Sequence, residues 1–188
     1  MLSAETFSTT RIDTLWSEII DGTTVNDSGT EFSVVDDGPT PYAVSAADDN
    51  NDNIVELTVA TMPTDATPNV TFTSTIFRDL AGNQAPSPKT VTTVDGVAPI
   101  LSAVSISSNN DGDLAAPEWA KTGDVVTLTF TSSETVAVPT VLIQGVAATV
   151  NAPSGNNWTA TRTMAVTDAP QGTLGISIAF ADVAVPTP

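Results

Sequence analysis

Residues 124–131 read Asp-Val-Val-Thr-Leu-Thr-Phe-Thr. Apolar side chains occupy positions 126, 128 and 130, while threonines occupy positions 127, 129 and 131. Successive side chains of a β-strand point to opposite faces, so this period of two predicts a strand with one buried and one solvated face. The stretches 55–59 and 174–180 repeat the alternation. The chain is therefore predicted to be built from β-strands.

Runs of this kind recur along the chain, separated by turns rich in Gly, Asn, Asp and Pro. They predict strands near 2–7, 11–19, 31–35, 41–47, 54–60, 69–77, 89–94, 100–107, 124–132, 140–144, 146–151, 157–166 and 173–181. Many short strands at this spacing are typical of antiparallel sandwiches of about 90 residues each. The predicted fold class is all-β, with two such sandwiches in tandem.

The boundary between the two sandwiches is predicted at Val94-Asp95-Gly96-Val97-Ala98-Pro99, because Pro99 holds the chain extended and forbids a helix. This places the first domain at 1–95, a linker at 96–99 and the second domain at 100–188. The halves also repeat short motifs in the same order, beginning with Leu-Ser-Ala at 2–4 and again at 101–103. We therefore interpret the chain as two copies of one module, the second with an insertion between its first two strands.

The composition excludes several classes of function. The 188 residues contain 22 Asp and Glu against 5 Lys and Arg, a formal net charge of −17, which disfavours binding to nucleic acid. The absence of Cys and His removes thiolate and imidazole chemistry, so we expect no enzymatic activity. No stretch approaches the roughly 18 apolar residues of a membrane span. The sequence lacks a signal peptide at Met1, and we expect an exported parent protein to carry it upstream.

Three stretches resemble a known family. Residues 19–25, the sequence Asp-Leu-Ala-Gly-Asn at 79–83, and residues 94–99 are similar to bacterial immunoglobulin-like repeats of large cell-surface, S-layer-associated and adhesin-type proteins. Residues 100–182 resemble a sister repeat, with Asp182-Val183-Ala184 where the Asp-Leu-Ala-Gly-Asn signature would stand. The resemblance implies two tandem immunoglobulin-like antiparallel β-sandwiches. The second is expected to lack its last strand.

The resemblance also implies a location and a role. The expected location is extracellular or at the cell surface, and the expected role is a non-catalytic stalk, spacer or surface-assembly module. Its partners would be neighbouring domains of a longer chain, a surface glycan, or another copy of the chain through an open sheet edge. The alternative is a glycan- or ligand-binding module of an adhesin or extracellular enzyme.

Immunoglobulin-like connectivity would gather the acidic residues at the ends of the sandwiches. Glu18, Asp48, Asp52 and Asp79 would lie at the N-terminal pole of the first domain. The junction between domains would carry a second group, consisting of Asp36, Asp37, Asp95, Glu134 and Asp182. Calcium takes six to eight oxygen ligands, which such loops can supply. We therefore expect calcium as a cofactor that rigidifies the junctions of an array.

Acidic loops also arise without any metal, because Asp and Asn side chains bond local backbone amides in turns. Residues 48–53 imitate the start of an EF-hand, but Asn53 and Val59 stand where that motif needs Gly and Glu. A solvated loop and a metal loop therefore both remain open there. Asp79 is expected to brace its own hairpin, with Gly82 and Asn83 adopting positive φ.

The three tryptophans are predicted to differ in role. Trp16 and Trp158 are in phase with apolar strand neighbours, which predicts core packing. Trp119 lies in the inserted segment and is the candidate ligand-binding residue. Glu18 and Glu134 fall in different domains, so their spacing gives no support to the carboxylate pair of a glycoside hydrolase.

Overall fold

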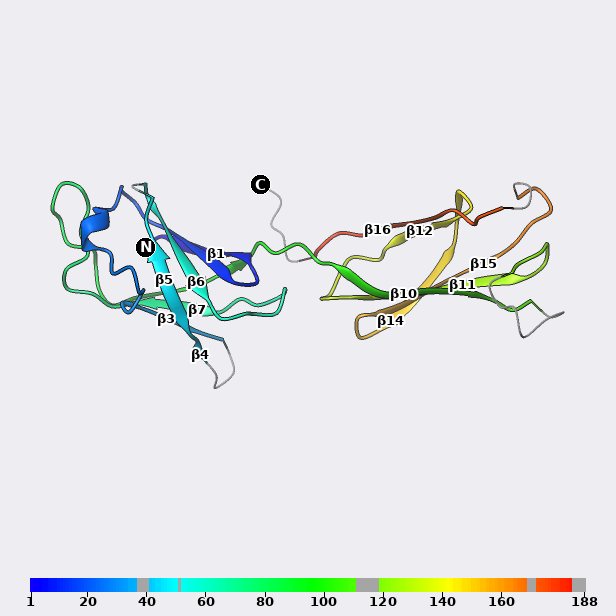
Figure 1. The fold of residues 1–188 in the computed structure, drawn as a ribbon, viewed down its shortest axis with the longest axis horizontal. Helices are drawn as coiled ribbons and strands as arrows, with labels where there is room; N and C mark the ends of the chain where they lie inside the picture. Colours follow the sequence, from blue (N-terminus) through cyan, green and yellow to red (C-terminus); the bar gives the residue numbers. More distant parts are fainter. Residues whose placement is uncertain (37–40, 51, 111–118, 169–171, 184–188) are drawn as a thin grey trace. The chain divides into compact units, whose positions relative to one another are not determined.

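The structure is a computed structural model that describes residues 1–36, 41–50, 52–110, 119–168 and 172–183. Strands dominate these residues, and a short 3₁₀ turn, η1 (Gly22–Thr24), is the helical element among them. The chain divides into two compact units, Met1–Ala98 and Pro99–Val183, as Figure 1 shows. The all-β prediction is therefore confirmed.

The first unit has two sheets. A five-stranded sheet has the order β5-β6-β2-β1-β9, made of β1 (Ser3–Ser8), β2 (Arg11–Leu15), β5 (Val44–Asp48), β6 (Ile54–Val59) and β9 (Val94–Asp95). A four-stranded sheet has the order β4-β3-β7-β8, made of β3 (Phe32–Val35), β4 (Pro41–Tyr42), β7 (Asn69–Phe72) and β8 (Lys89–Thr92). All pairings are antiparallel except that of β9, which runs parallel to β1.

The second unit also has two sheets, which form the two layers drawn in Figure 1. One has the order β10-β11-β15-β14, made of β10 (Leu101–Ser108), β11 (Val125–Ser132), β14 (Thr149–Ser154) and β15 (Asn157–Thr163). The other has the order β13-β12-β16, made of β12 (Thr140–Ile143), β13 (Val146–Ala147) and β16 (Ile176–Ala179). All these pairings are antiparallel.

The two units have the same strand order. In the first unit the orders are β5-β6-β2-β1 and β4-β3-β7. Adding nine to each strand number gives the orders of the second unit, β14-β15-β11-β10 and β13-β12-β16. The units differ in the connection between their first two strands, which covers residues 9–10 in the first and 109–124 in the second. This topology agrees with the repeat and with the insertion predicted from the sequence.

The first core is centred on Trp16, which is 3% exposed. Its ring lies 4.9 Å from that of Phe72 and 4.6 Å from that of Phe77, both centroid to centroid. The indole Nε1 donates to the hydroxyl of Thr14 at 3.1 Å, so the polar atom is satisfied inside the core. Phe72 and Trp16 come from opposite sheets, and their contact joins the two layers.

The second core contains Phe130 of β11 and Trp158 of β15, whose rings stack with their centroids 6.4 Å apart. Both are buried, so the predicted core roles of Trp16 and Trp158 are confirmed. Arg162 of β15 also connects the two sheets of this unit. Its guanidinium donates to the carbonyl of Ile143 on β12 at 2.8 Å and pairs with Asp168.

Several strands are shorter than their patterns predict, since β2 ends at Leu15, β15 ends at Thr163 and β16 covers only Ile176–Ala179. Strand β7 shows a local cause. The alternation at 69–77 predicts an extended strand, but β7 ends at Phe72. The hydroxyl of Ser74 accepts from the amides of Ile76 and Phe77, while the Ser74 amide donates to Ser87 Oγ. These side-chain bonds compete with the strand ladder and turn the chain, although Phe77 still reaches the core.

The two separate cores predict separate stabilities. Phe72→Ala leaves a cavity between the sheets of the first unit and should lower the free energy of unfolding of that unit by about 3–5 kcal/mol. Hydrogen exchange should show faster opening in β2, β3 and β6, with β11 and β15 unchanged. Leu128→Ala is the matched variant and should affect the second unit alone. Equal loss of protection in both units for either variant would contradict the division.

Candidate functional site

Acidic residues gather at one end of the first unit, where β2 ends and β6 begins. Ile20 forms an isolated bridge with Asp79, and its amide donates to the carbonyl of Asp52 at 3.1 Å. The Glu18 side chain is among the lesser influences that lower the pKa of Asp79, so these two side chains lie close together. Of the acids expected at this pole, Glu18, Asp52 and Asp79 lie close together here.

The Asp79 carboxylate braces its own hairpin. It accepts from the Asn83 amide at 2.8 Å through one oxygen and from the Asn83 side chain at 2.8 Å through the other. The bonds from the Asn83 side chain and then its backbone hold the pKa of Asp79 below its ordinary value. Gly82 has the predicted positive φ of 87°. Asn83 is not among the residues of positive φ, so the prediction for Asn83 is wrong. Asn83 acts through its amide group instead.

The loop that imitates an EF-hand uses its side chains locally. Asp48 accepts from the Asn50 amide at 3.3 Å, and Asp52 accepts from the Ile54 amide at 2.6 Å. The Asn50 side chain donates to Glu56 at 3.1 Å. These bonds are those of a turn, and among the described residues neither Asp48 nor Asp52 belongs to a group of three close metal-ligating side chains.

The opposite end of the first unit carries Asp36 and Asp95. Asp36 follows β3 and accepts a hydrogen bond from the Tyr42 hydroxyl at 3.2 Å. The pKa of Tyr42 is raised, mainly by desolvation and then by this hydrogen bond. Asp95 ends β9, is 3% exposed, and accepts from the Val97 amide at 3.0 Å and from the Thr6 hydroxyl at 3.4 Å. Asp37 lies outside the described residues.

Asp95 is held by a close backbone approach. The Gly96 amide donates to the Thr6 hydroxyl at 3.2 Å, so β1 fixes both residues of the Asp95-Gly96 pair. A side chain at position 96 would place its Cβ 2.8 Å from the Thr6 carbonyl oxygen. Only glycine fits there without a shift of the backbone. The sequence signal for this arrangement was the Asp-Gly pair, but the partner Thr6 was missed because it is nearly 90 residues away.

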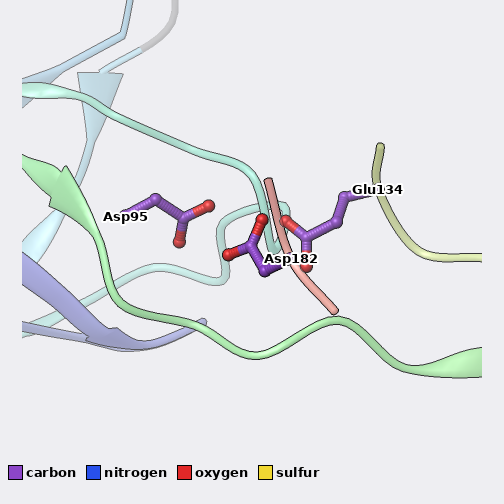
Figure 2. Close-up of side chains that lie close together, drawn as sticks. All are labelled: Asp95, Glu134 and Asp182. Atoms are coloured by element: carbon purple, nitrogen blue, oxygen red, sulfur yellow. The ribbon is translucent and has the colours of Figure 1, made fainter. Parts of the chain in front are cut away.

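Glu134 and Asp182 meet at the end of the second unit where the chain enters it. The Ser133 amide donates to the Ile100 carbonyl at 2.9 Å, which places Glu134 beside the entering strand. Val136 forms an isolated bridge with Asp182, and carboxylate oxygens of Glu134 and Asp182 lie within 4.8 Å of each other. Figure 2 shows these two side chains directed toward one another, and also draws Asp95 of the first unit.

The two units therefore hold the same acidic pair. In the first, Glu18 lies two residues before Ile20, which bridges to Asp79. In the second, Glu134 lies two residues before Val136, which bridges to Asp182. In each unit the Glu follows the second strand, β2 or β11, and the Asp follows β7 or its equivalent β16. The sequence repeat already aligned Asp182 with Asp79, and the expected poles gathered each Glu with its Asp. The bridges themselves were not visible in the sequence, because they join residues that are about 45 to 60 positions apart.

Trp119 is 69% exposed, in contrast to the two core tryptophans. Its carbonyl accepts a hydrogen bond from the Ser108 hydroxyl at the end of β10. The indole is thus accessible to a ligand. Chemically, the ends of the units offer carboxylates that can bind cations, and Trp119 offers a flat apolar ring on which a sugar can stack.

No protein-family model matches the chain, and no curated protein matches it. Among solved structures, the chain is similar to the crystal structure of the S-layer protein rSbsC(31-844), with 13% sequence identity and a TM-score of 0.44. The match covers 96% of this chain and 32% of that chain. A similarity of this extent assigns neither a fold nor a function. Among the described residues, no helix is long and apolar enough to cross a membrane.

The brace on Asp79 predicts a pKa change. Asn83→Ala removes the side-chain hydrogen bond and should raise the pKa of Asp79 toward its ordinary 3.8, as measured by carboxyl NMR titration. A lowered folded-state pKa gives stability that is present above the unfolded pKa and is lost as pH falls through the folded pKa. As the pH is lowered, the free energy of unfolding of the variant should therefore fall by less than that of the parent. Asn109→Ala is the control, and an unshifted Asp79 in Asn83→Ala would contradict the brace.

Proposed function

We propose that this chain is a non-catalytic segment of a bacterial surface protein, in which two tandem immunoglobulin-like domains act as a stalk, spacer or surface-assembly module. The observation that carries the proposal is the strand-for-strand equivalence of the two units. Repeated modules of one topology extend a chain by a fixed unit, which is what a stalk or spacer needs. The proposed location is extracellular or at the cell surface, with neighbouring domains of a longer chain as partners.

The strand order supports the immunoglobulin-like assignment. In that fold the first, second, fifth and fourth strands form one sheet, and the third, sixth and seventh form the other. Counting within the first unit without β4, the sheets β5-β6-β2-β1 and β3-β7-β8 have this order, and β4 is the additional strand beside β3. The second unit has the same order through β16. The sequence resemblance at 79–83 and 94–99 supports the same assignment.

A non-catalytic role is consistent with the side chains available. A hydroxyl nucleophile needs an adjacent base, and the sequence has no His. Asp79 braces a hairpin, Asp48 and Asp52 cap turns, and Arg162 pairs with Asp168 inside the second unit. These charged groups have structural partners in the fold.

The alternative function is a glycan-binding module, and the exposed ring of Trp119 is the observation that favours it. A glycan array distinguishes the two functions. A spacer should give no reproducible hits with the full chain, and Trp119→Ala should leave the array unchanged. A coherent family of bound glycans that disappears in Trp119→Ala would overturn the spacer role and support the alternative. Trp119→Phe serves as the matched control because it keeps an aromatic ring.

We also propose calcium as a cofactor of this module, bound by the entry-end pair Glu134 and Asp182 of the second unit. Since the first unit carries the equivalent pair Glu18 and Asp79, the same arrangement could recur at each junction of an array. Calcium favours such oxygen-rich sites.

Calcium binding predicts a specific stabilisation. A cation at a hundredfold excess over its dissociation constant stabilises the form that binds it by about 2.7 kcal/mol. Millimolar calcium should raise the calorimetric unfolding midpoint of the parent, and Glu134→Gln or Asp182→Asn should lose most of that shift. Magnesium should substitute poorly because it demands near-octahedral geometry.

The control for this experiment is Asp27→Asn, which removes one negative charge from an exposed acid of the first unit. It should retain the full response to calcium. Equal responses to calcium and magnesium, unchanged in Glu134→Gln and Asp182→Asn, would mean that the cations only screen a surface of net charge −17. That result would remove the calcium proposal and leave the spacer role untouched.

A further inference from the structure

Strand β16 has a side that no described strand occupies. It pairs with β12 on one side, whereas its equivalent β7 in the first unit is paired on both sides, with β3 and with β8. In an antiparallel ladder, the backbone N–H and C=O groups of successive residues point alternately toward the partner strand and away from it. The Gln144 amide donates to the Gly175 carbonyl, so the backbone groups of Gly175 and of every second residue after it point toward β12. It follows that the backbone groups of Ile176 and Ile178 point away from β12. That edge is therefore oriented to receive a strand.

The first unit contains the strand that fills the equivalent position. Residues 89–95 pair antiparallel with β7 through β8, with Val91 opposite Val70, and then parallel with β1 through β9, with Asp95 opposite Thr6. One seven-residue segment thus extends both sheets. Its alternate residues Val91, Thr93 and Asp95 are half-buried or buried.

The strands that border this position differ in burial between the units. In β1, Ala4 and Thr6 are 2% and 0% exposed. In the equivalent strand β10, every residue from Ser102 to Ser107 is exposed, including Val104 and Ile106. Ile176 of β16 is exposed as well. Apolar side chains are therefore uncovered on both borders of the position that residues 89–95 fill in the first unit.

The same two strands lack three of the features that protect sheet edges, although the register of β10 with β11 shifts between Ser102 and Ser105. Edge strands are normally blunted by a charge, a proline or a very short length. Among the described edge strands, β4, β9 and β13 have two residues each, β5 and β8 carry Asp48 and Lys89, and β14 contains Pro153. Strands β10 and β16 have four or more residues, no charge and no proline. Their sequences suit a covered edge.

We propose that the second unit binds an extended peptide strand of another polypeptide, antiparallel to β16 and then alongside β10. The strand has the chemistry of residues 89–95, with β-branched residues at alternate positions and a lysine at its N-terminal end. Antiparallel pairing puts that lysine toward the carboxyl end of β16, the end that carries Asp182 and Glu134. Charge complementarity therefore fixes the direction of the strand. The spacer role does not need this edge, so the two proposals can fail separately.

The probe is a copy of residues 89–95 joined to the full chain through a flexible linker of ten Gly and Ser residues, which raises its local concentration. Amide exchange of Ile176 and Ile178 should slow by at least tenfold relative to the parent chain. A control extension with the same seven residues in shuffled order should leave the exchange unchanged. Equal protection by the true and the shuffled extensions would overturn the proposal.

Ile176→Pro is the matched variant on the receiving strand, because it removes an amide that points away from β12 and keeps the β12 ladder. Exchange in β11 and β15 reports whether the second unit remains folded. In this variant the true extension should no longer protect Ile178. Persistent protection there would contradict strand addition at β16.

Sedimentation of the parent chain tests whether a second copy of the chain occupies this edge. We expect a monomer whose Ile176 and Ile178 amides exchange rapidly. Concentration-dependent dimers with protected Ile178 would assign the edge to a second copy and overturn the proposal. Slow exchange of Ile176 and Ile178 in the dilute monomer would also overturn it, because the edge would already be closed.

Discussion

The packing of two sheets across one apolar core is the constraint on which the rest of each unit depends. Trp16, Phe72 and Phe77 meet between the layers of the first unit, and Phe130 and Trp158 stack in the second. A shift of one residue in any of these strands would move its apolar side chains to the solvent face. Core packing therefore fixes the register of the strands, and the register fixes which end of the unit each loop occupies.

The positions of the acidic residues follow from that register. Glu18 and Glu134 come after the second strand of their units, and the bridges from Ile20 and Val136 bring Asp79 and Asp182 to the same ends. Neither pair is created by local sequence alone. Each is held by a strand ladder that begins in the core, which is why equivalent strands carry equivalent pairs of acids. The carboxylates are placed by hydrophobic packing and are then available for electrostatic roles.

The alternation of apolar and polar residues was sufficient to locate most strands. The pattern at 124–132 corresponds to β11 (Val125–Ser132), and that at 54–60 to β6 (Ile54–Val59). The end of β7 was missed because Ser74 takes local backbone bonds that an alternation rule does not include. The prediction of a positive φ at Asn83 was wrong for a similar reason, because its side chain donates to Asp79 without a left-handed backbone conformation.

The candidate sites were predictable to the extent that they depend on strand order. The strand connectivity expected from the sequence was enough to gather Glu18, Asp52 and Asp79, which the first unit brings together. The contact of Asp95 with Thr6 depends on the parallel pairing of β9 with β1. This pairing joins only two residues of each strand, which is too short for the hydrophobic periodicity of the sequence to indicate. Long-range pairings of this kind become visible only when the sheets are assembled.

The sheet edges complete the physical picture of the second unit. A strand within a sheet satisfies backbone groups on both sides, and natural edges are protected by charge, proline or short length. In a chain of net charge −17, the edge strands β10 and β16 have at least four residues each and contain neither a charged residue nor a proline. Charge is concentrated instead at the loop ends, where Glu134 and Asp182 lie. The second unit therefore separates two kinds of interaction, with electrostatic groups at its entry end and neutral backbone pairing along one side.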